Sequence, residues 1–292
     1  MSSSRTLSGK GHRNENFPVA SALIAPQYRP TILAFYRFAR AADDVADHGT
    51  LGVSEKLGLL DSLEATLLGR SDDEAEALPL RAAIEEKGLS PRHALDLLVA
   101  FRMDVTKNRY ADWNELIEYC RYSAMPVGRF VLDVHGESTA TWKANDALCA
   151  ALQIINHLQD CGMDYRSIDR VYIPLDALSA AGLGVEALDA EMASPALRQC
   201  LKGLAERTAL LLEDSAPFAS MIGNFRLSLE VAVIQRLAEA LNEGLLKRDP
   251  LSEQVHFGAA RALSIALPAI LNAAFGRLRA RPAQAAGKAD LS

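Results

Sequence analysis

Residues 30–47, PTILAFYRFARAADDVAD, are the stretch that decides the fold. Pro30 suits the first position of a helix, where its missing N–H group would have no partner in any case. From Ile32 to Val45 the apolar side chains recur at the spacing of one helical face. We therefore predict that the first long helix runs from Pro30 to Asp47 and turns this apolar face toward a core.

The composition of the whole chain extends this prediction. Of its 292 residues 49% are hydrophobic and only 6% are aromatic, and alanine and leucine outnumber the β-branched residues. This balance favours helices over sheets. No linker rich in proline, glycine or serine divides the chain, so we predict one all-α domain. Further helices are expected at about 54–69, 91–107, 113–135, 146–161, 197–222, 226–246 and 256–278.

Pro126 interrupts the helical pattern of residues 113–135. A proline inside a helix removes a hydrogen bond and clashes with the preceding turn. Two outcomes stay open, a kinked helix or a turn near Met125.

The two ends of the chain are expected to lie outside the helical domain, which we place at 14–280. Residues 1–13 are polar and predict a flexible segment, and residues 281–292 predict a disordered tail. The polar start has no apolar stretch like that of a secretory signal. The four cysteines form no C-x-x-C pair. Both features predict a cytoplasmic protein with reduced cysteines.

The formal net charge of −6 argues against a nucleic-acid partner, which would require a basic face. An anionic substrate would therefore need metal ions or a local group of arginines.

The first acidic motif, Asp43 and Asp47, lies on the first predicted helix. Residues four apart share a helical face, where two carboxylates repel each other unless a cation lies between them. A hard divalent ion with oxygen ligands, such as Mg²⁺, is the natural cation for such a pair. One pair of this kind also occurs by chance on a solvated face, so a single motif does not predict a metal site.

A second acidic motif, Asp160 and Asp164, repeats the spacing at the end of another apolar helix, and Asn156 precedes it by one turn. Two such helices, packed antiparallel, would hold Mg²⁺ ions between facing carboxylates and bind a diphosphate group. Arg40 lies on the carboxylate side of the first motif, and Arg166 and Arg170 follow the second. We predict that these three arginines bind the diphosphate.

Taken together, these residues resemble those of the squalene/phytoene synthase family over about residues 14–250. The resemblance rests on four groups of residues in order: Tyr36, Arg40, Asp43, Asp44 and Asp47; Met103, Asp104, Arg109 and Tyr110; Tyr119, Cys120, Tyr122, Val127 and Gly128; and Gln153, Asn156, Asp160, Asp164, Arg170, Tyr172, Ile173 and Pro174. It implies an isoprenoid synthase bundle with a central active-site cavity and an enzyme that acts on prenyl diphosphates.

Departures from the usual family pattern point to one branch. Residues 123–129 read SAMPVGR, Gln159 stands where an arginine is usual, and residues 14–18 replace the usual serines. This set is similar to the bacterial hydroxysqualene synthases of hopanoid biosynthesis. The resemblance implies that presqualene diphosphate and water give hydroxysqualene and diphosphate.

The resemblance also implies roles for individual residues. A cationic intermediate needs a water-poor pocket with aromatic faces, for which Phe17, Tyr36 and Tyr122 are candidates, although ordinary core packing explains each of them as well. We expect Tyr36, Tyr122 and Asn156 to be catalytic, with Asn16, Phe17, Arg40, Arg166, Arg170 and Tyr172 as substrate ligands, and Asp43, Asp47, Asp160 and Asp164 as metal ligands. No nicotinamide is expected, because no Gly-x-Gly-x-x-Gly lies between a strand and a helix. We expect surface or packing roles for His48, His135 and His157.

Two alternatives remain at this point. One is a head-to-head prenyl transferase that makes presqualene diphosphate, squalene or phytoene. The other is a non-catalytic helical protein that binds lipids or partners. No pattern indicates the oligomeric state.

The last predicted helix combines a charge-free run at 262–276 with Arg277, Arg279 and Arg281 after it. The run is shorter than the about 20 apolar residues that a membrane span requires. We expect weak peripheral association with the inner face of a membrane. A core helix followed by a solvated basic tail is the alternative.

Overall fold

The computed structural model describes residues 23–286, with side chains throughout that range except at 259 and 275–286. Within this range the chain forms helices and a single isolated bridge between Arg109 and Val171, which confirms the all-α prediction. The helices are α1 (Arg29–Ala46), α2 (Val53–Leu67), α3 (Leu78–Lys87), α4 (Arg92–Thr106), α5 (Trp113–Ser123), α6 (Met125–Val134), η1 (Thr139–Thr141), α7 (Trp142–Ile168), α8 (Leu175–Ala180), η2 (Val185–Asp189), α9 (Pro195–Ser215), α10 (Phe218–Met221), α11 (Phe225–Lys247) and α12 (Ala259–Ala286).

The predicted helix at 113–135 is divided by a turn at Ala124 into α5 and α6. The N–H group of Ala124 closes α5 on the carbonyl of Cys120, and Pro126 then occupies the first turn of α6. In that position the missing N–H of proline leaves no hydrogen bond unmade. The structure thus selects the turn rather than the kink.

Other boundaries differ from the predicted ones. The helix α3 was not predicted, α7 extends beyond both ends of 146–161, and α12 continues to Ala286, past the expected end near 278. In the range that the structure describes, no helix is both long enough and apolar enough to cross a membrane. The flexible segment at 1–13 lies outside the described residues and stays a prediction.

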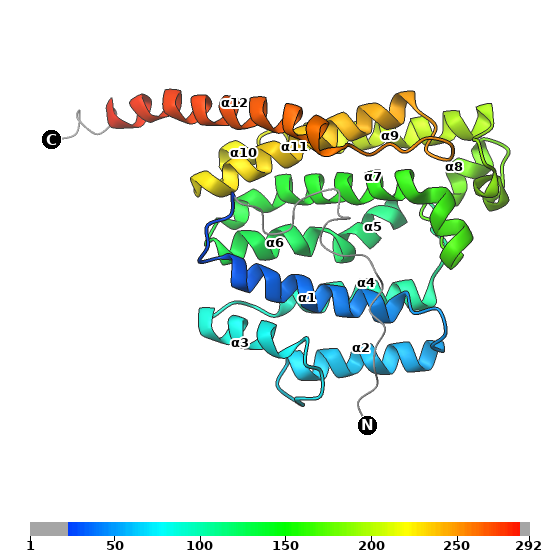
Figure 1. Cartoon of the computed structure of the whole chain (residues 1–292), viewed down its shortest axis with the longest axis horizontal. Helices are drawn as coiled ribbons and strands as arrows, with labels where there is room; N and C mark the ends of the chain where they lie inside the picture. The colour runs from blue at the N-terminus through cyan, green and yellow to red at the C-terminus, as the bar shows by residue number, and fades with distance from the viewer. Residues whose placement is uncertain (1–22, 287–292) are drawn as a thin grey trace.

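Two large apolar clusters make up most of the core and meet along α4 and α6. One cluster joins α1 to α4 around side chains such as Phe38 and Leu63, and the other joins α5 to α11 around side chains such as Ile154. Phe35 of α1 stacks on Phe130 of α6 with their ring centres 4.0 Å apart. Figure 1 shows α1 to α4 below, α5 to α7 in the middle, and α9, α11 and α12 above.

The helices that carry the acidic motifs, α1 and α7, run in the same direction, so the antiparallel prediction is wrong. Near their starts, the ring of Tyr28 lies 4.0 Å from that of His135, which precedes α7. At their ends, Arg170 donates to the carboxylate of Asp47 at 2.9 Å. Both helices run from left to right in Figure 1. Each motif lies near the C-terminal end of its helix, so only a parallel arrangement brings the two motifs to the same end of the molecule.

A close approach of α6 to α7 at Gly128 provides a test of this packing. A Cβ atom on Gly128 would lie 2.0 Å from the Asn145 side-chain oxygen and 2.7 Å from the Cys149 sulfur. Gly128→Ala is therefore expected to lower the free energy of unfolding by about 1–3 kcal/mol, because the two helices must separate. Urea unfolding of the variant measures this change.

Gly203 in α9 offers a matched control, because a Cβ atom there would meet nothing within 4 Å. Gly203→Ala is expected to raise the free energy of unfolding by about 0.5–1 kcal/mol through helix propensity alone. Equal midpoints for the two alanine variants would contradict close packing at Gly128.

Candidate active site

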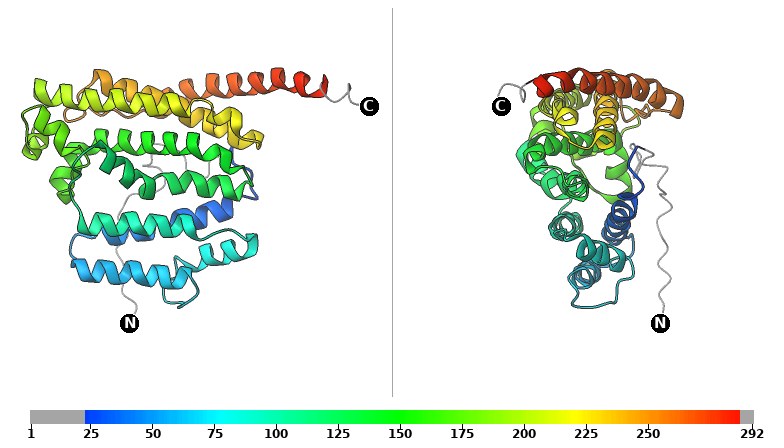
Figure 2. Two further views of the ribbon diagram at one scale, coloured as in Figure 1. Left: turned by 180° about the vertical axis from the view of Figure 1, so that it is seen from behind. Right: turned by 90° about the vertical axis from the view of Figure 1, so that its left-hand side faces the viewer.

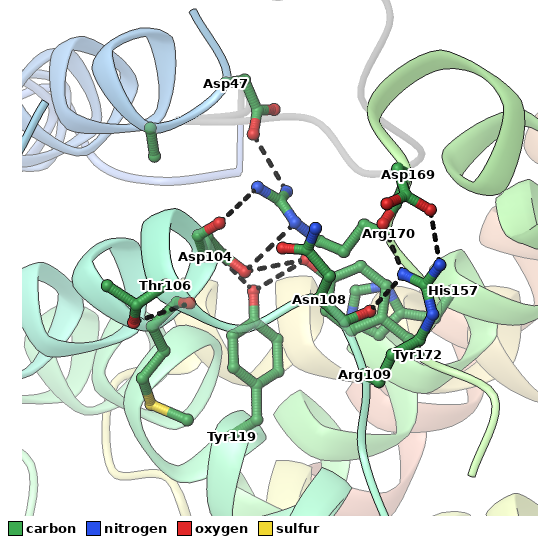
Figure 3. Close-up of polar contacts among 12 residues, drawn as sticks. Asp47, Asp104, Thr106, Asn108, Arg109, Tyr119, His157, Asp169, Arg170 and Tyr172 are labelled. Carbon is green, nitrogen blue, oxygen red and sulfur yellow. Dashed lines mark hydrogen bonds and ion pairs between the residues drawn. The ribbon is translucent and has the colours of Figure 1, made fainter. Parts of the chain in front are cut away.

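Arg170 lies at the centre of the polar cluster in Figure 3. The residue before it, Asp169, adopts a left-handed conformation with φ of 50° and ends α7. Arg109 holds this turn through an ion pair with Asp169, and the bridge between Arg109 and Val171 fixes the chain that follows. These local contacts return the chain toward α1 and α4, and they aim the Arg170 side chain at both helices.

The Arg170 guanidinium connects the first acidic motif to α4. It donates to the Asp47 carboxylate at 2.9 Å and to the backbone carbonyl of Asp104 at 3.0 Å. Its Nε atom lies 3.7 Å from the Asp104 carboxylate, and only 8% of the side chain is exposed. A buried guanidinium shared by two acids is a strong local source of positive charge.

Asp104 is a buried carboxylate that two tyrosines hold in place. Tyr119 and Tyr172 donate to its two oxygens at 2.9 and 3.0 Å, and the two hydroxyl oxygens lie 3.3 Å apart. Burial raises the pKa of Asp104 to about 6, against the opposing effects of Arg170 and of both tyrosines. Burial also raises the pKa of both tyrosines well above the ordinary value, so their hydroxyls remain donors.

His157 extends this cluster as a neutral ring. It stacks on Tyr172 with ring centres 3.5 Å apart, and its Nε2 atom lies 3.1 Å from the Gln153 amide nitrogen. Burial, and then the charge of Arg170, lower the pKa of His157 to about 3. The imidazole is buried and adds an aromatic face without a positive charge, and the surface or packing role expected for His157 stays a prediction.

Arg40 lies beside the carboxylates of the first motif, on the side that the sequence predicts. It donates to Asp43 at 2.7 Å and lies 3.2 Å from Asp44. Although 36% of the Asp43 side chain is exposed, its removal from bulk water and the neighbouring charge of Asp47 raise the pKa of Asp43 to about 7, against the opposing charge of Arg40. The charge of Arg40 therefore does not offset the combined effect of burial and of Asp47 on the pKa of Asp43.

The donor chemistry of both motifs fits Mg²⁺. Each motif offers two carboxylates. Burial, and then the charge of Asp47, raise the pKa of Asp43, so a cation bound between the two carboxylates of the first motif would favour their charged forms. Among the described residues, no three His, Cys, Asp or Glu side chains converge on one point. Mg²⁺ commonly takes one or two carboxylates and fills its remaining positions with water and phosphate oxygens. The motifs therefore suit ions that a bound diphosphate shares, rather than a cage made by the protein alone.

The other predicted site residues are placed as follows. Asp160, Asp164 and Asn156 lie half-buried on α7, Tyr36 lies half-buried on α1, and Tyr122 packs against the larger apolar cluster. Arg166 is exposed and donates to the backbone carbonyl of Leu188 in η2. Asn16 and Phe17 lie outside the described residues. The roles of all these residues stay predictions.

Asp104, Tyr119 and His157 belong to this cluster but were not among the predicted site residues. Asp104 occupies the apolar face of α4, which also buries Leu97. A carboxylate at such a position needs charged or hydrogen-bonding partners, and this is the signal that could have identified it. The partners themselves come from α5 and from the end of α7, far along the chain.

The chain is similar in sequence and fold to known proteins. The squalene/phytoene synthase family matches residues 11–261. The chain is 63% identical to a hydroxysqualene synthase from Rhodopseudomonas palustris over 255 residues, which cover 87% of each protein. It is 52% identical to a hydroxysqualene synthase from Zymomonas mobilis, covering 95% of this chain and 93% of that one. A solved squalene synthase from Alicyclobacillus acidocaldarius superposes with a TM-score of 0.69 at 28% identity, covering 78% of this chain and 86% of that one.

Proposed function

Because this chain belongs to the squalene/phytoene synthase family, we propose that it is a hydroxysqualene synthase that converts presqualene diphosphate and water into hydroxysqualene and diphosphate. The observation that carries this proposal is the 63% identity to the Rhodopseudomonas palustris hydroxysqualene synthase over most of both chains. The family and its relatives are isoprenoid synthases, so an enzyme is favoured over a lipid-binding or partner-binding protein without catalytic activity.

In the proposed reaction the C–O bond to diphosphate breaks and the electron pair leaves with the diphosphate. The cyclopropylcarbinyl cation rearranges, a water oxygen bonds to carbon, and one proton is released. The pairs Asp43 with Asp47 and Asp160 with Asp164 would hold Mg²⁺, which when bound neutralises charge on the leaving group. Arg40 and Arg170 add fixed positive charge at the same end of the helices.

The aromatic cluster suits a cationic intermediate. Tyr110, Tyr119, Tyr172 and His157 are buried with their rings in contact. A histidine with a pKa of about 3 stays neutral, so it does not repel a carbocation. The hydroxyls of Tyr119 and Tyr172 donate to Asp104 and remain protonated, so they are weaker competing nucleophiles than phenolates would be.

Product analysis tests the proposal. Purified protein, Mg²⁺ and presqualene diphosphate, with no reductant, are expected to give hydroxysqualene and diphosphate. The second candidate is a head-to-head prenyl transferase. Over part of its length the chain is 31% identical to a phytoene synthase from Pseudescherichia vulneris, and this identity favours that candidate. Formation of a condensed product from farnesyl diphosphate alone would support that candidate and exclude the hydration proposal.

The Mg²⁺ requirement is expected to rise as the pH falls below 7. Asp43, with its pKa raised to about 7, takes up a proton in that range, and the proton competes with the metal ion. The Mg²⁺ concentration that gives half-maximal turnover should therefore be about tenfold higher at pH 6 than at pH 8. Mg²⁺ titrations of turnover at both pH values measure this, and equal requirements would contradict competition between a proton and Mg²⁺ at Asp43 in this pH range.

We also propose a location in the cell for this protein, because the substrate and the product of the proposed reaction are lipids. Arg277, Arg279 and Arg281 follow a charge-free run and can attract anionic headgroups. Weak peripheral association of a cytoplasmic protein with the inner face of the membrane is the expected result. Vesicle flotation of the full chain and of a chain lacking residues 277–292 tests it.

A further inference from the structure

One face of α12 presents a row of leucines to solvent. Leu263, Leu267 and Leu271 expose 58%, 52% and 56% of their surface. They are spaced by four residues, so they lie along a single side of the helix. We call these three residues the leucine strip. Isolated exposed leucines are ordinary on protein surfaces, but three in a row on one helix form a continuous apolar patch.

The opposite face of α12 already holds the helix on the protein. That face packs on α11 through one small cluster, which includes Ala262, Ile265, Ala266, Ala269 and Ile270 from α12 and Val233 and Leu237 from α11. Ala269 is only 6% exposed. The leucine strip is therefore not needed to attach α12 to α11. A helix that is apolar on both sides is normally covered on both sides.

The charges of α12 indicate what covers the strip. Residues 259–286 contain four arginines, Arg261 before the strip and Arg277, Arg279 and Arg281 after it, and no aspartate, glutamate or lysine. The whole chain has a net charge of −6, so α12 differs in sign from the rest of the protein. A leucine strip on a helix whose sequence carries only positive charge matches a bilayer with anionic headgroups, because the leucines can enter the acyl boundary and the positive charge of the segment attracts the headgroups.

The position of α12 on the molecule allows a flat bilayer to contact this helix. The helix lies along the outer edge of the molecule, and its C-terminal part projects beyond the other helices in Figure 1 and in the left-hand view of Figure 2. We infer that the leucine strip is the surface by which the protein rests on an anionic lipid bilayer, an inference that builds on the proposed membrane association. A second copy of the chain is less suitable, because two α12 helices paired in parallel would bring two groups of arginines together.

Flotation with vesicles tests the inference on the full chain. The wild-type protein is expected to float with vesicles of phosphatidylcholine and phosphatidylglycerol, and to float poorly with pure phosphatidylcholine or at high salt. The triple variant Leu263→Gln, Leu267→Gln and Leu271→Gln should lower binding to the anionic vesicles at least about tenfold. Glutamine retains good helix propensity, and circular dichroism checks that α12 persists.

Leu210 of α9 supplies a matched control, because 59% of its surface is exposed and it lies outside α12. Leu210→Gln should float like the wild type. Turnover of detergent-dispersed presqualene diphosphate should be the same in the wild type and in all these variants. Absence of turnover by the wild type would count against the proposed reaction and not against the leucine strip. Normal flotation of the triple variant would overturn the inference. So would a wild-type dimer, seen by light scattering, that binds no vesicles and that the triple variant loses.

Discussion

Turnover of presqualene diphosphate is expected to fall by a factor of about 10³ when Asp43 is replaced by asparagine. The amide keeps the size of the side chain and can still accept the hydrogen bond that Arg40 donates at 2.7 Å. It carries no charge, so it binds Mg²⁺ weakly and leaves the charge on the departing diphosphate less well neutralised. The same loss is expected for Asp160→Asn. Steady-state turnover over a wide range of Mg²⁺ concentrations measures both variants.

An exposed aspartate away from both motifs provides the control. Asp61 on α2 is 69% exposed and pairs with Arg102, and Asp61→Asn should keep turnover within about twofold of the wild type. High Mg²⁺ should restore part of the activity of Asp43→Asn and should not change Asp61→Asn. Full activity of Asp43→Asn at ordinary Mg²⁺ concentrations would refute the metal assignment, and it would favour a protein whose function does not depend on this site.

Replacement of Arg170 by alanine is expected to lower the free energy of unfolding by about 3–5 kcal/mol, because it leaves the buried Asp104 carboxylate without its cation. Turnover should also fall at least about a hundredfold, since the variant loses the contact with Asp47 and its own positive charge. Arg166→Ala is the matched control for stability. That arginine is exposed and only reaches the Leu188 carbonyl, so its loss should change stability by less than about 0.5 kcal/mol.

The pH dependence of Arg170→Ala separates loss of the ion pair from loss of packing. In the wild type the pKa of Asp104 is raised to about 6, and removal of Arg170 raises it further. A carboxyl group with a raised pKa in the folded state destabilises the fold as the pH rises through that window, so the variant should be more stable at pH 5 than at pH 8. Adding Asp104→Asn should restore stability at pH 8 and have little effect at pH 5. If the double variant is no more stable at pH 8, the destabilisation comes from packing.

The sequence was sufficient to predict the features that depend on local patterns of residues. The spacing of apolar residues from Ile32 to Val45 predicted α1 within a residue or two at each end. Arg40 was expected on the carboxylate side of Asp43 because three residues make almost one helical turn, and it donates there. The all-α fold followed from the scarcity of β-branched residues. In each case the signal lies within a few residues of the feature.

Features that depend on tertiary contacts were missed or predicted wrongly. The direction of α7 relative to α1 depends on how the intervening helices pair, and no local pattern contains that information. The helix α3 has only ten residues and buries just Leu80 and Ile84, so its periodicity is too short to distinguish it from a loop. The partners of Asp104 come from α5 and from the chain after α7. A buried acid can be suspected from sequence, but its partners cannot be identified without the fold.

The contact between Arg170 and Asp47 spans 123 positions of the chain, and this separation has a consequence for biosynthesis. A nascent chain that has been made only through α6 contains Asp43, Asp47 and most of the cluster that joins α1 to α4. It lacks Asp160, Asp164 and Arg170, and the closure of so long a loop comes late in folding. The first motif on the ribosome therefore keeps Arg40 but lacks the contact between Asp47 and Arg170. Under the proposed function, turnover is expected only after α7 has been released and docked.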